Sequence, residues 1–401
     1  MNKKINNLSK LMIIVLALSL ALTGCNGSRE SGKVENNEES NIDNNNSDKK
    51  VDEETGLVFE RSMELKYAKS FSVDYYKDGY KKLTDSAGRK VLLVPEGKDV
   101  PEVVEGVQVI KQPIEEIGVL STGDMALVTA LNGIDRVTMV ATAMEDWYIP
   151  QVVEKMESGD IKFIGKSDSL DYELIEANKP DLMFVSLGRE QTAQKLTNRF
   201  DELDIDWIGI RVSKEEDPRG RLEWIKYIGA ILDKEEEAEA FFEGELAKIQ
   251  KVEDEIKSLE TEKPKVAYVR ITKDGYTVKN KGDYSVKMLE LAGGEYIFED
   301  LNPDKDGTMK ISAEEFYTLA EDVDILIYEN MGPFVGSISQ ILEKGEHLKD
   351  IKAIKEGRVW GTKKNYWQSV DKTADMIVEL YEIFTKPQGE IKDTEHYFLM
   401  D

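Results

Sequence analysis

The side chains that usually perform catalysis or bind bare transition metals are scarce in this chain. It has two histidines, His347 and His396, and one cysteine, Cys25, among 401 residues. A Zn²⁺ or Mn²⁺ site of the multi-histidine type is therefore hard to build. The chain has no G-x-S-x-G nucleophile elbow, and with so few histidines a nucleophile lacks a convenient base. We expect a binding protein that is not an enzyme and holds no cofactor and no resident metal.

Aromatic and cationic side chains that could bind a small molecule recur directly after predicted strands. Open α/β sheets bind ligands in this position, at the carboxyl ends of their strands. A chelated or macrocyclic ligand needs aromatic walls with a few fixed polar groups, and arginine or lysine beside such walls suits an anionic, aromatic ferric siderophore. Met125 fits core packing as well as ligation of haem iron. The candidate ligand-binding residues are Thr122, Met125, Trp147, Tyr148, Lys166, Arg189, Arg270, Tyr276, Asn330, Tyr366 and Trp367, with Asp124, Lys281, Lys364 and Asn365 in the same loops.

The formal net charge of −26 excludes one large class of partners. Nucleic-acid binding depends on clustered lysine and arginine, which this composition does not favour. The acidity suits a soluble protein outside the cytoplasm, although charge alone does not locate it.

The first 25 residues have the pattern of an export signal. Lys3, Lys4 and Lys10 precede an apolar run over 11–22 that is too short to span about 30 Å of hydrocarbon. Cys25 follows Leu22-Thr23-Gly24, which resembles the lipobox of bacterial lipoproteins. That resemblance implies cleavage before Cys25 and a lipid on its thiol, which would anchor the protein to the outer face of the cell membrane. The alternative is an idle thiol beside an ordinary cleavage site.

Residues 26–56 are predicted to be a disordered tether. The stretch VENNEESNIDNNNSDKK contains almost nothing apolar and cannot bury enough surface to fold. A flexible segment of this length would reach on the order of 30 Å.

The rest of the chain alternates between short apolar runs and helical stretches. Period-two patterns over 71–94 indicate a small antiparallel ribbon. Strand and helix patterns then alternate, which predicts a largely parallel sheet covered by helices. The predicted strands start at Val107, Arg136, Lys162, Leu182 and Trp207, and the rhythm restarts after Pro264 with KVAYVRI, DILIYE and RVWGT. The fold class is therefore α/β, with two Rossmann-like lobes: an N-terminal lobe at 57–232, a linker helix at 233–262 and a C-terminal lobe at 263–401.

One long helix is predicted between the lobes, over 234–259. Apolar residues recur there every three to four positions, from Ala238 to Leu259. Asp233 and Glu236 have the spacing of a capping box, and Pro264 ends the segment. At ~1.5 Å per residue the helix would span roughly 39 Å. Its apolar stripe is also that of an ordinary amphipathic surface helix.

A local pattern is shared by the two halves. Asp171 and Ser312 are predicted N-caps, which places Glu173 and Glu314 in the first turns of their helices. Such glutamates often do no more than stabilise the helix start.

Several segments, in this order, resemble the class III solute-binding lipoproteins of bacterial ABC importers, which include siderophore-, haem- and cobalamin-binding members. They are the lipobox, LTDSAGRKV from Leu83, SLDYELIEANKPDLMFV, the joining helix, MLELAGGEYIF and ISAEEFYTLAEDVDILIY. The resemblance implies two lobes with a ligand cleft between them and a rigid helix behind it. It also implies that Glu173 and Glu314, or Glu315 beside it, face arginines of a permease dimer. The expected function is capture of an iron chelate, with haem or a corrinoid as alternatives, and a surface receptor without a transporter is a further alternative.

Overall fold

The computed structural model describes residues 50–188, 190–272 and 275–401. The predicted signal at 1–25 with Cys25, most of the predicted tether at 26–56, and the candidate residue Arg189 lie outside these ranges. Among the helices that are described, none is long and apolar enough to cross a membrane.

The first sheet contains β1 to β5 in spatial order. Its strands are Phe59–Ser62, Ser72–Tyr76, Lys81–Thr84, Lys90–Val94 and Val107–Lys111. The first four pair antiparallel, which confirms the predicted ribbon. The prediction for the fifth strand was wrong, because β5 pairs in parallel with β4 and does not join the next sheet. Residues 95–106 supply the crossover of about a dozen residues that a parallel pair requires.

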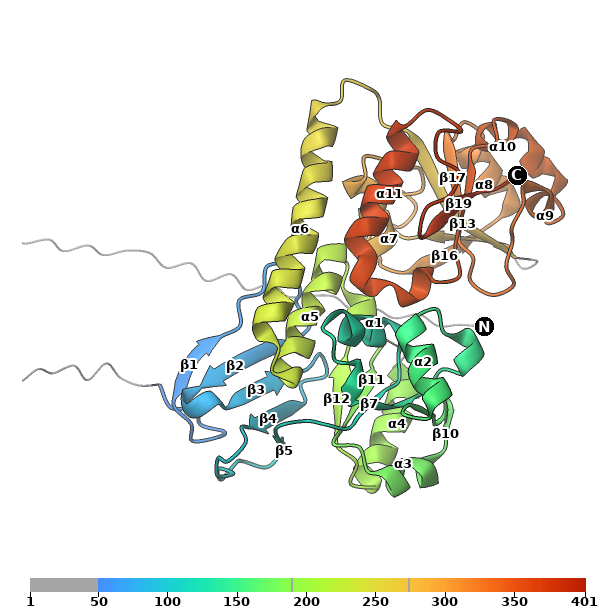
Figure 1. Ribbon diagram of the computed structural model, residues 1–401. Coiled ribbons are helices and arrows are strands. Elements are labelled where there is room, and N and C mark those ends of the chain that lie inside the picture. Colours follow the sequence, from blue (N-terminus) through green and yellow to red (C-terminus); the bar gives the residue numbers. More distant parts are fainter. Residues whose placement is uncertain (1–49, 189, 273–274) are drawn as a thin grey trace, which may run out of the picture. The chain divides into compact units, whose positions relative to one another are not determined.

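A parallel five-stranded sheet with the order β12-β11-β6-β7-β8 forms the centre of the N-terminal lobe (Figure 1). Its strands in chain order are Ile117–Val119, Val137–Val140, Lys162–Phe163, Leu182–Ser186 and Trp207–Ile210. The strand β6 was not predicted, since a three-residue run with a central glycine has no readable period. The short helix η1 (Lys77–Gly79) connects β2 to β3 in the first sheet. The other elements of this half are α1 (Thr122–Ala130), η2 (Ile134–Arg136), η3 (Met144–Asp146), α2 (Pro150–Ser158), the hairpin β9 (Gly165–Lys166) and β10 (Ser169–Leu170), α3 (Tyr172–Asn178), α4 (Glu190–Glu202), η4 (Val212–Lys214) and α5 (Pro218–Leu232).

A seven-stranded mixed sheet forms the centre of the C-terminal lobe. Its order is β16-β14-β13-β17-β18-β19, with β15 also paired to β13. The strands in chain order are Lys265–Thr272, Gly275–Lys279, Glu295–Tyr296, Thr308–Ile311, Ile325–Tyr328, Val359–Thr362 and Tyr397–Leu399. The helices are α7 (Tyr284–Leu291), α8 (Ala313–Ala320), α9 (Ile338–Leu342), η5 (Glu346–Asp350), α10 (Lys352–Lys355), η6 (Tyr366–Gln368), η7 (Val370–Lys372) and α11 (Thr373–Thr385). The predicted strands KVAYVRI, DILIYE and RVWGT are confirmed as β13, β17 and β18.

The long helix is α6, Glu235–Ser258, and its 24 residues span about 36 Å at ~1.5 Å per residue. Its predicted capping box was wrong. Asp233 is the left-handed C-cap residue of α5, and its carboxylate accepts hydrogen bonds from Lys81 and Gln112. Lys234 is the N-cap residue of α6 and makes no capping bond, so the glutamates of the first turn face the helix dipole instead.

The helix α5 is the most deeply buried helix along this part of the chain. Nearly all of its residues are buried, and it packs against α1, α6, α7 and α11 (Figure 1). The C-terminal part of α5 is apolar on all sides, as expected for a helix that neighbours surround, while the buried charged residues Arg221, Glu223 and Lys226 lie before this part. The shared interface of α5, α6 and α11 therefore joins the regions on either side of the long helix.

Candidate functional site

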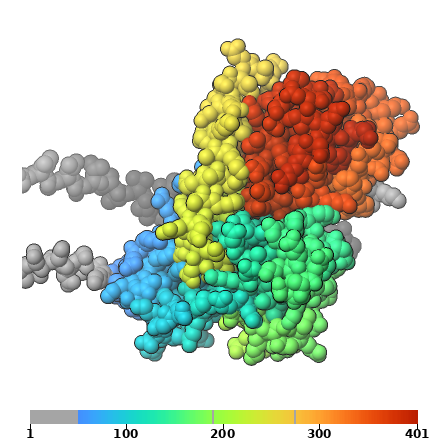
Figure 2. Space-filling view, viewed as in Figure 1, coloured from blue at the N-terminus to red at the C-terminus, as the bar shows by residue number. Residues whose placement is uncertain are grey.

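The two lobes meet at a junction that the Gln368 side chain bridges. The Gln368 side chain of η6 accepts a hydrogen bond from the Tyr148 backbone N–H at 2.8 Å and donates to the Asp146 carbonyl at 2.7 Å. The helix α1 packs against η6 and η7 beside it, and a Cβ on Gly123 would lie 3.0 Å from Val370. Figure 2 shows the orange and red surface of the C-terminal half meeting the green N-terminal half along this junction.

A groove of about 470 Å³ opens at the same junction. This volume lies within the range of small-molecule sites. Tyr148 contributes from the N-terminal lobe, and the other lining residues come from the C-terminal lobe. The lining residues are Tyr148, Phe334, Lys363, Lys364, Asn365, Asp393 and Phe398.

The groove combines apolar rings with one ammonium group that is free of carboxylates. Phe334 and Phe398 stack with ring centroids 5.4 Å apart, and Phe334 and Tyr148 are each 43% exposed. The Lys364 ammonium lies 5.5 Å from the Phe334 ring. Lys363 pairs with Asp393 at 2.7 Å, whereas Lys364 forms no ion pair with any described residue. An anionic ligand with a planar apolar body could stack on the aromatic rings and pair its charge with the Lys364 ammonium.

The loop that carries Phe334 is held by Asn330. The side chain of this buried residue donates to the carbonyls of Val335 and Thr362 and accepts from the Val335 N–H. The Trp367 indole N–H lies 3.5 Å from the Asn330 carbonyl. Asn330 thus fixes the backbone of the loop that carries Phe334, and Trp367 contacts this loop at the Asn330 carbonyl.

A buried charge cluster lies at the carboxyl ends of β13 and β17. Lys279 pairs with Glu329 at 2.7 Å, and the Arg270 guanidinium lies 3.8 Å from the same carboxylate. Burial opposes the charge on Lys279, but the carboxylates of Asp283 and Glu329 outweigh it and raise the lysine pKa. The Lys279 ammonium also lies 5.8 Å from the Trp367 ring. The cluster places fixed charge behind Trp367.

The remaining candidate ligand residues lie in several places. Thr122 begins α1 at the junction, while Met125 is fully buried in the core. Trp147 is buried and donates to the Thr142 carbonyl. The other positions are Lys166, exposed on β9; Tyr276, stacked on Phe316 in the C-terminal core; Tyr366, buried; and Lys281, which is paired with Glu299 and lines a separate groove with Lys214 and Lys287.

Both candidate permease contacts are exposed residues in first helical turns. Asp171 accepts from the Leu174 N–H, and Ser312 accepts from the Glu315 N–H, so the two predicted N-caps are confirmed. Glu173, Glu314 and Glu315 are exposed, and within the described residues none of their carboxylates forms an ion pair.

Sequence reasoning missed Phe334, Lys363, Asp393 and Phe398 of the groove lining, and Gln368 at the junction. Phe334 follows the strand β17 by six residues, so the rule of loops after strands could have included it. Phe398 lies on the edge strand β19, beyond the last helix, where no local pattern marks it. Gln368 is one residue beyond the predicted cluster at 364–367.

Two α/β lobes with a groove at their junction define the class of the solute-binding proteins. The chain belongs to the periplasmic binding protein family, whose model matches residues 117–366. The resemblance inferred from the sequence is thereby confirmed, and the family consists of substrate-binding proteins of the type that serves ABC importers.

Relatives and solved structures agree with this assignment. An uncharacterized lipoprotein of Methanocaldococcus jannaschii is 28% identical over 365 residues, which cover 84% of each chain. The fold is similar to a periplasmic haem-binding protein from Pseudomonas aeruginosa, with a TM-score of 0.57 and 17% identity over 72% of this chain and 98% of that chain. It is also similar to a protein described as a possible iron-binding (periplasmic solute-binding) protein from Staphylococcus epidermidis, with a TM-score of 0.56 and 17% identity over 69% and 100% of the two chains.

Proposed function

We propose that this protein captures an iron chelate outside the cytoplasm, a ferric siderophore in the first place, and delivers it to the permease dimer of an ABC importer. In this proposal a lipid on Cys25 anchors it to the outer face of the membrane, with 26–56 as tether. The folded part is divided into lobes at 57–232 and 263–401, with the linker at 233–262.

The groove at the lobe junction carries the proposal. Tyr148, Phe334 and Phe398 supply exposed aromatic surface, and Lys364 supplies a positive charge that no described carboxylate neutralises. In a chain with a net charge of −26, a free ammonium among aromatic rings favours an anionic aromatic ligand. The similarity of the fold to a haem-binding protein and to a possible iron-binding protein supports the same ligand class.

Haem is the second candidate, since a flat macrocycle with carboxylates would also use stacked rings and a lysine. A corrinoid fits less well because it offers no comparable flat aromatic face. A surface receptor with the same groove but no transporter predicts binding without uptake.

The test is a fluorescence titration of the full chain with ferric siderophores, haem and cobalamin. Trp147 directly precedes the lining residue Tyr148, and the Trp367 indole contacts the Asn330 carbonyl, so the ligand that binds should quench tryptophan emission. Phe334→Ala should lower the affinity for that ligand by roughly tenfold, as expected for losing a buried aromatic contact. Lys364→Gln should lower the affinity for an anionic ligand and leave the affinity for a neutral ligand unchanged.

The matched control is Phe163→Ala, which removes an exposed ring of similar size on β8. The Phe163→Ala variant should bind the same ligand with the affinity of the unaltered protein. Failure of every ligand to quench, or equal losses in Phe334→Ala and Phe163→Ala, would contradict the proposal.

A further inference from the structure

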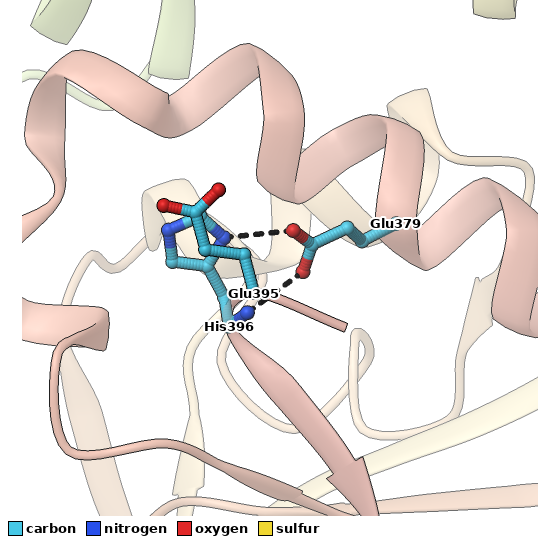
Figure 3. Close-up of side chains that lie close together, drawn as sticks. All are labelled: Glu379, Glu395 and His396. Carbon is cyan, nitrogen blue, oxygen red and sulfur yellow. Dashed lines mark hydrogen bonds and ion pairs between the residues drawn. The ribbon is translucent and has the colours of Figure 1, made fainter. Parts of the chain in front are cut away.

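A histidine near the C-terminus sits in an environment unlike that of an ordinary tail residue. His396 directly precedes β19, beyond the matched family region, and is fully buried. Its Nδ1 lies 2.9 Å from Glu379 Oε1, and its backbone N–H donates to Glu379 Oε2 at 3.0 Å (Figure 3). Glu379 projects from α11, so it holds the histidine at two points.

This arrangement decides which nitrogen of the neutral ring carries the proton. A carboxylate accepts only, so Nδ1 must donate, and the lone pair is then left on Nε2. Among the described residues Nε2 has no hydrogen-bond partner, although it is buried. A buried acceptor without a partner costs free energy unless something binds it.

Further carboxylates lie close to the ring. Ligand atoms of Glu379, Glu395 and His396 lie within 4.8 Å of one another. In Figure 3 the Glu395 carboxylate overlaps the imidazole ring, whereas Glu379 approaches the ring at Nδ1. The half-buried Asp371 also interacts electrostatically with His396. The negative field and the free lone pair together favour a cation at Nε2.

We propose that His396 Nε2 and the Glu395 carboxylate bind a divalent transition-metal ion such as Zn²⁺ or Ni²⁺, with Glu379 orienting the imidazole through Nδ1. Metal-binding histidines commonly donate their other ring N–H to a carboxylate, which fixes the tautomer and raises ligand basicity. An imidazole ligand selects Zn²⁺, Ni²⁺ or Cu²⁺ over Ca²⁺ and Mg²⁺. Water completes the coordination sphere.

Coordination by both groups requires the Glu395 carboxylate to reach His396 Nε2. Zn–N and Zn–O bonds of about 2.0–2.2 Å place two ligand atoms roughly 3–4 Å apart around a shared ion. Glu395 is exposed, and its flexible side chain can close the remaining distance. Its backbone carbonyl is held by the Asn365 side chain at 3.2 Å, so the main chain stays in place.

This site is separate from the proposed cargo groove but shares a segment with it. Asp393 and Phe398 line the groove, and Glu395 and His396 lie between them in sequence. A bound ion would join Glu395 to His396, which Glu379 already holds against α11. The inference does not depend on which solute the groove carries.

The test uses NMR of imidazole ¹⁵N nuclei in the full chain, titrated with Zn²⁺ and with paramagnetic Ni²⁺. The chain has two histidines, so His347, whose Nε2 lies 2.9 Å from the Tyr276 hydroxyl, is an internal reference. Zn²⁺ should shift the Nε2 signal of His396, and Ni²⁺ should broaden it, at concentrations that leave His347 unchanged. Ca²⁺ should do neither.

Glu395→Gln keeps the size of an exposed side chain and should fold normally. It should weaken Zn²⁺ binding at His396 by at least about tenfold, the lower end of the cost of losing an outer partner. Glu390→Gln, also exposed in the C-terminal segment, should not change it. Equal effects of the metals on both histidines, unchanged affinity in Glu395→Gln, or a doubly protonated His396 ring that ignores Zn²⁺ would overturn the proposal.

Discussion

Asp124 shows how a single buried carboxyl can make stability depend on pH. It is fully enclosed near the start of α1, and its Oδ2 has no hydrogen-bond partner in the described part of the chain. Burial raises its pKa to about 7, while Ser121 and Arg221 pull in the other direction without cancelling the effect. In the unfolded chain the carboxyl ionises near pH 4. Between these two values the folded state binds more protons, so stability falls as the pH rises from about 4 to about 7.

Replacing Asp124 with asparagine should therefore stabilise the protein at pH 8, where the whole penalty is present. The gain in the free energy of unfolding should be on the order of a few kcal/mol and should shrink as the pH falls toward 4. Urea denaturation at pH 5 and pH 8 measures it. Asp322→Asn, an exposed position, should give the same small effect at both values. A gain for Asp124→Asn that is independent of pH would refute the assignment.

At the scale of elements, buried carboxylates attach an irregular segment to α5 and to the turn before it. Glu223 is completely buried and accepts hydrogen bonds from the backbone N–H groups of Lys66, Tyr67 and Ala68 at 2.7–2.8 Å. Glu215 holds Lys69 and Ser70 in the same way. The segment between β1 and β2 therefore depends on charge-assisted bonds from side chains more than 140 residues away in sequence.

Glu223→Gln should destabilise the fold by about 2–3 kcal/mol, because an amide presents an N–H where a backbone N–H needs an acceptor. Urea denaturation gives the loss, and limited proteolysis should cut the variant faster near residues 66–70. Glu216→Gln, exposed on the same chain segment, is the control. If both variants unfold at the same urea concentration, the carboxylate does not hold the segment.

The elements that the sequence predicts well are those whose own period reveals them. β13, β17 and α6 are long enough for an apolar pattern to appear. Asp171 and Ser312 mark the starts of α3 and α8. The pairing of β5 with β4 and the short strand β6 depend on contacts across the chain, which no local period encodes. The capping box failed because Asp233 belongs to the preceding helix.

At the scale of the whole molecule, the groove was only partly predictable for the same reason. The rule of loops after strands found Tyr148, Lys364 and Asn365. Phe398 reaches the groove because β19 pairs antiparallel with β18 after the final helix. Only the assembled sheet brings that ring against Phe334.

The proposed permease contacts belong to this scale because they lie in different lobes. Glu173→Ala combined with Glu314→Ala should abolish uptake of the ligand while leaving its affinity nearly unchanged. Individual exposed ion pairs are weak, about 0–1 kcal/mol, so single changes should have smaller effects. Glu176→Ala with Glu321→Ala supplies a control with the same loss of charge at exposed positions. If uptake survives the combined change of Glu173 and Glu314, these two residues are not the permease contacts. The Glu315→Ala variant then decides whether Glu315 takes the place of Glu314.

The extent of lobe closure follows from how the junction is built. Because α5 is buried among helices from both halves and α6 packs against α5 and α11, a wide hinge motion would have to break a large apolar interface. Small-angle scattering of the ligand-free and ligand-bound protein should therefore give nearly equal radii of gyration. Gln368→Leu removes both bonds to the 146–148 segment at little change in volume, and it should speed ligand release without changing the scattering curve. Gln151→Leu, exposed on α2, should change neither quantity. If the radius of gyration differs by several ångströms between the ligand-free and ligand-bound protein, the helical interface opens on binding. In that case Gln368 is not the contact that limits ligand release.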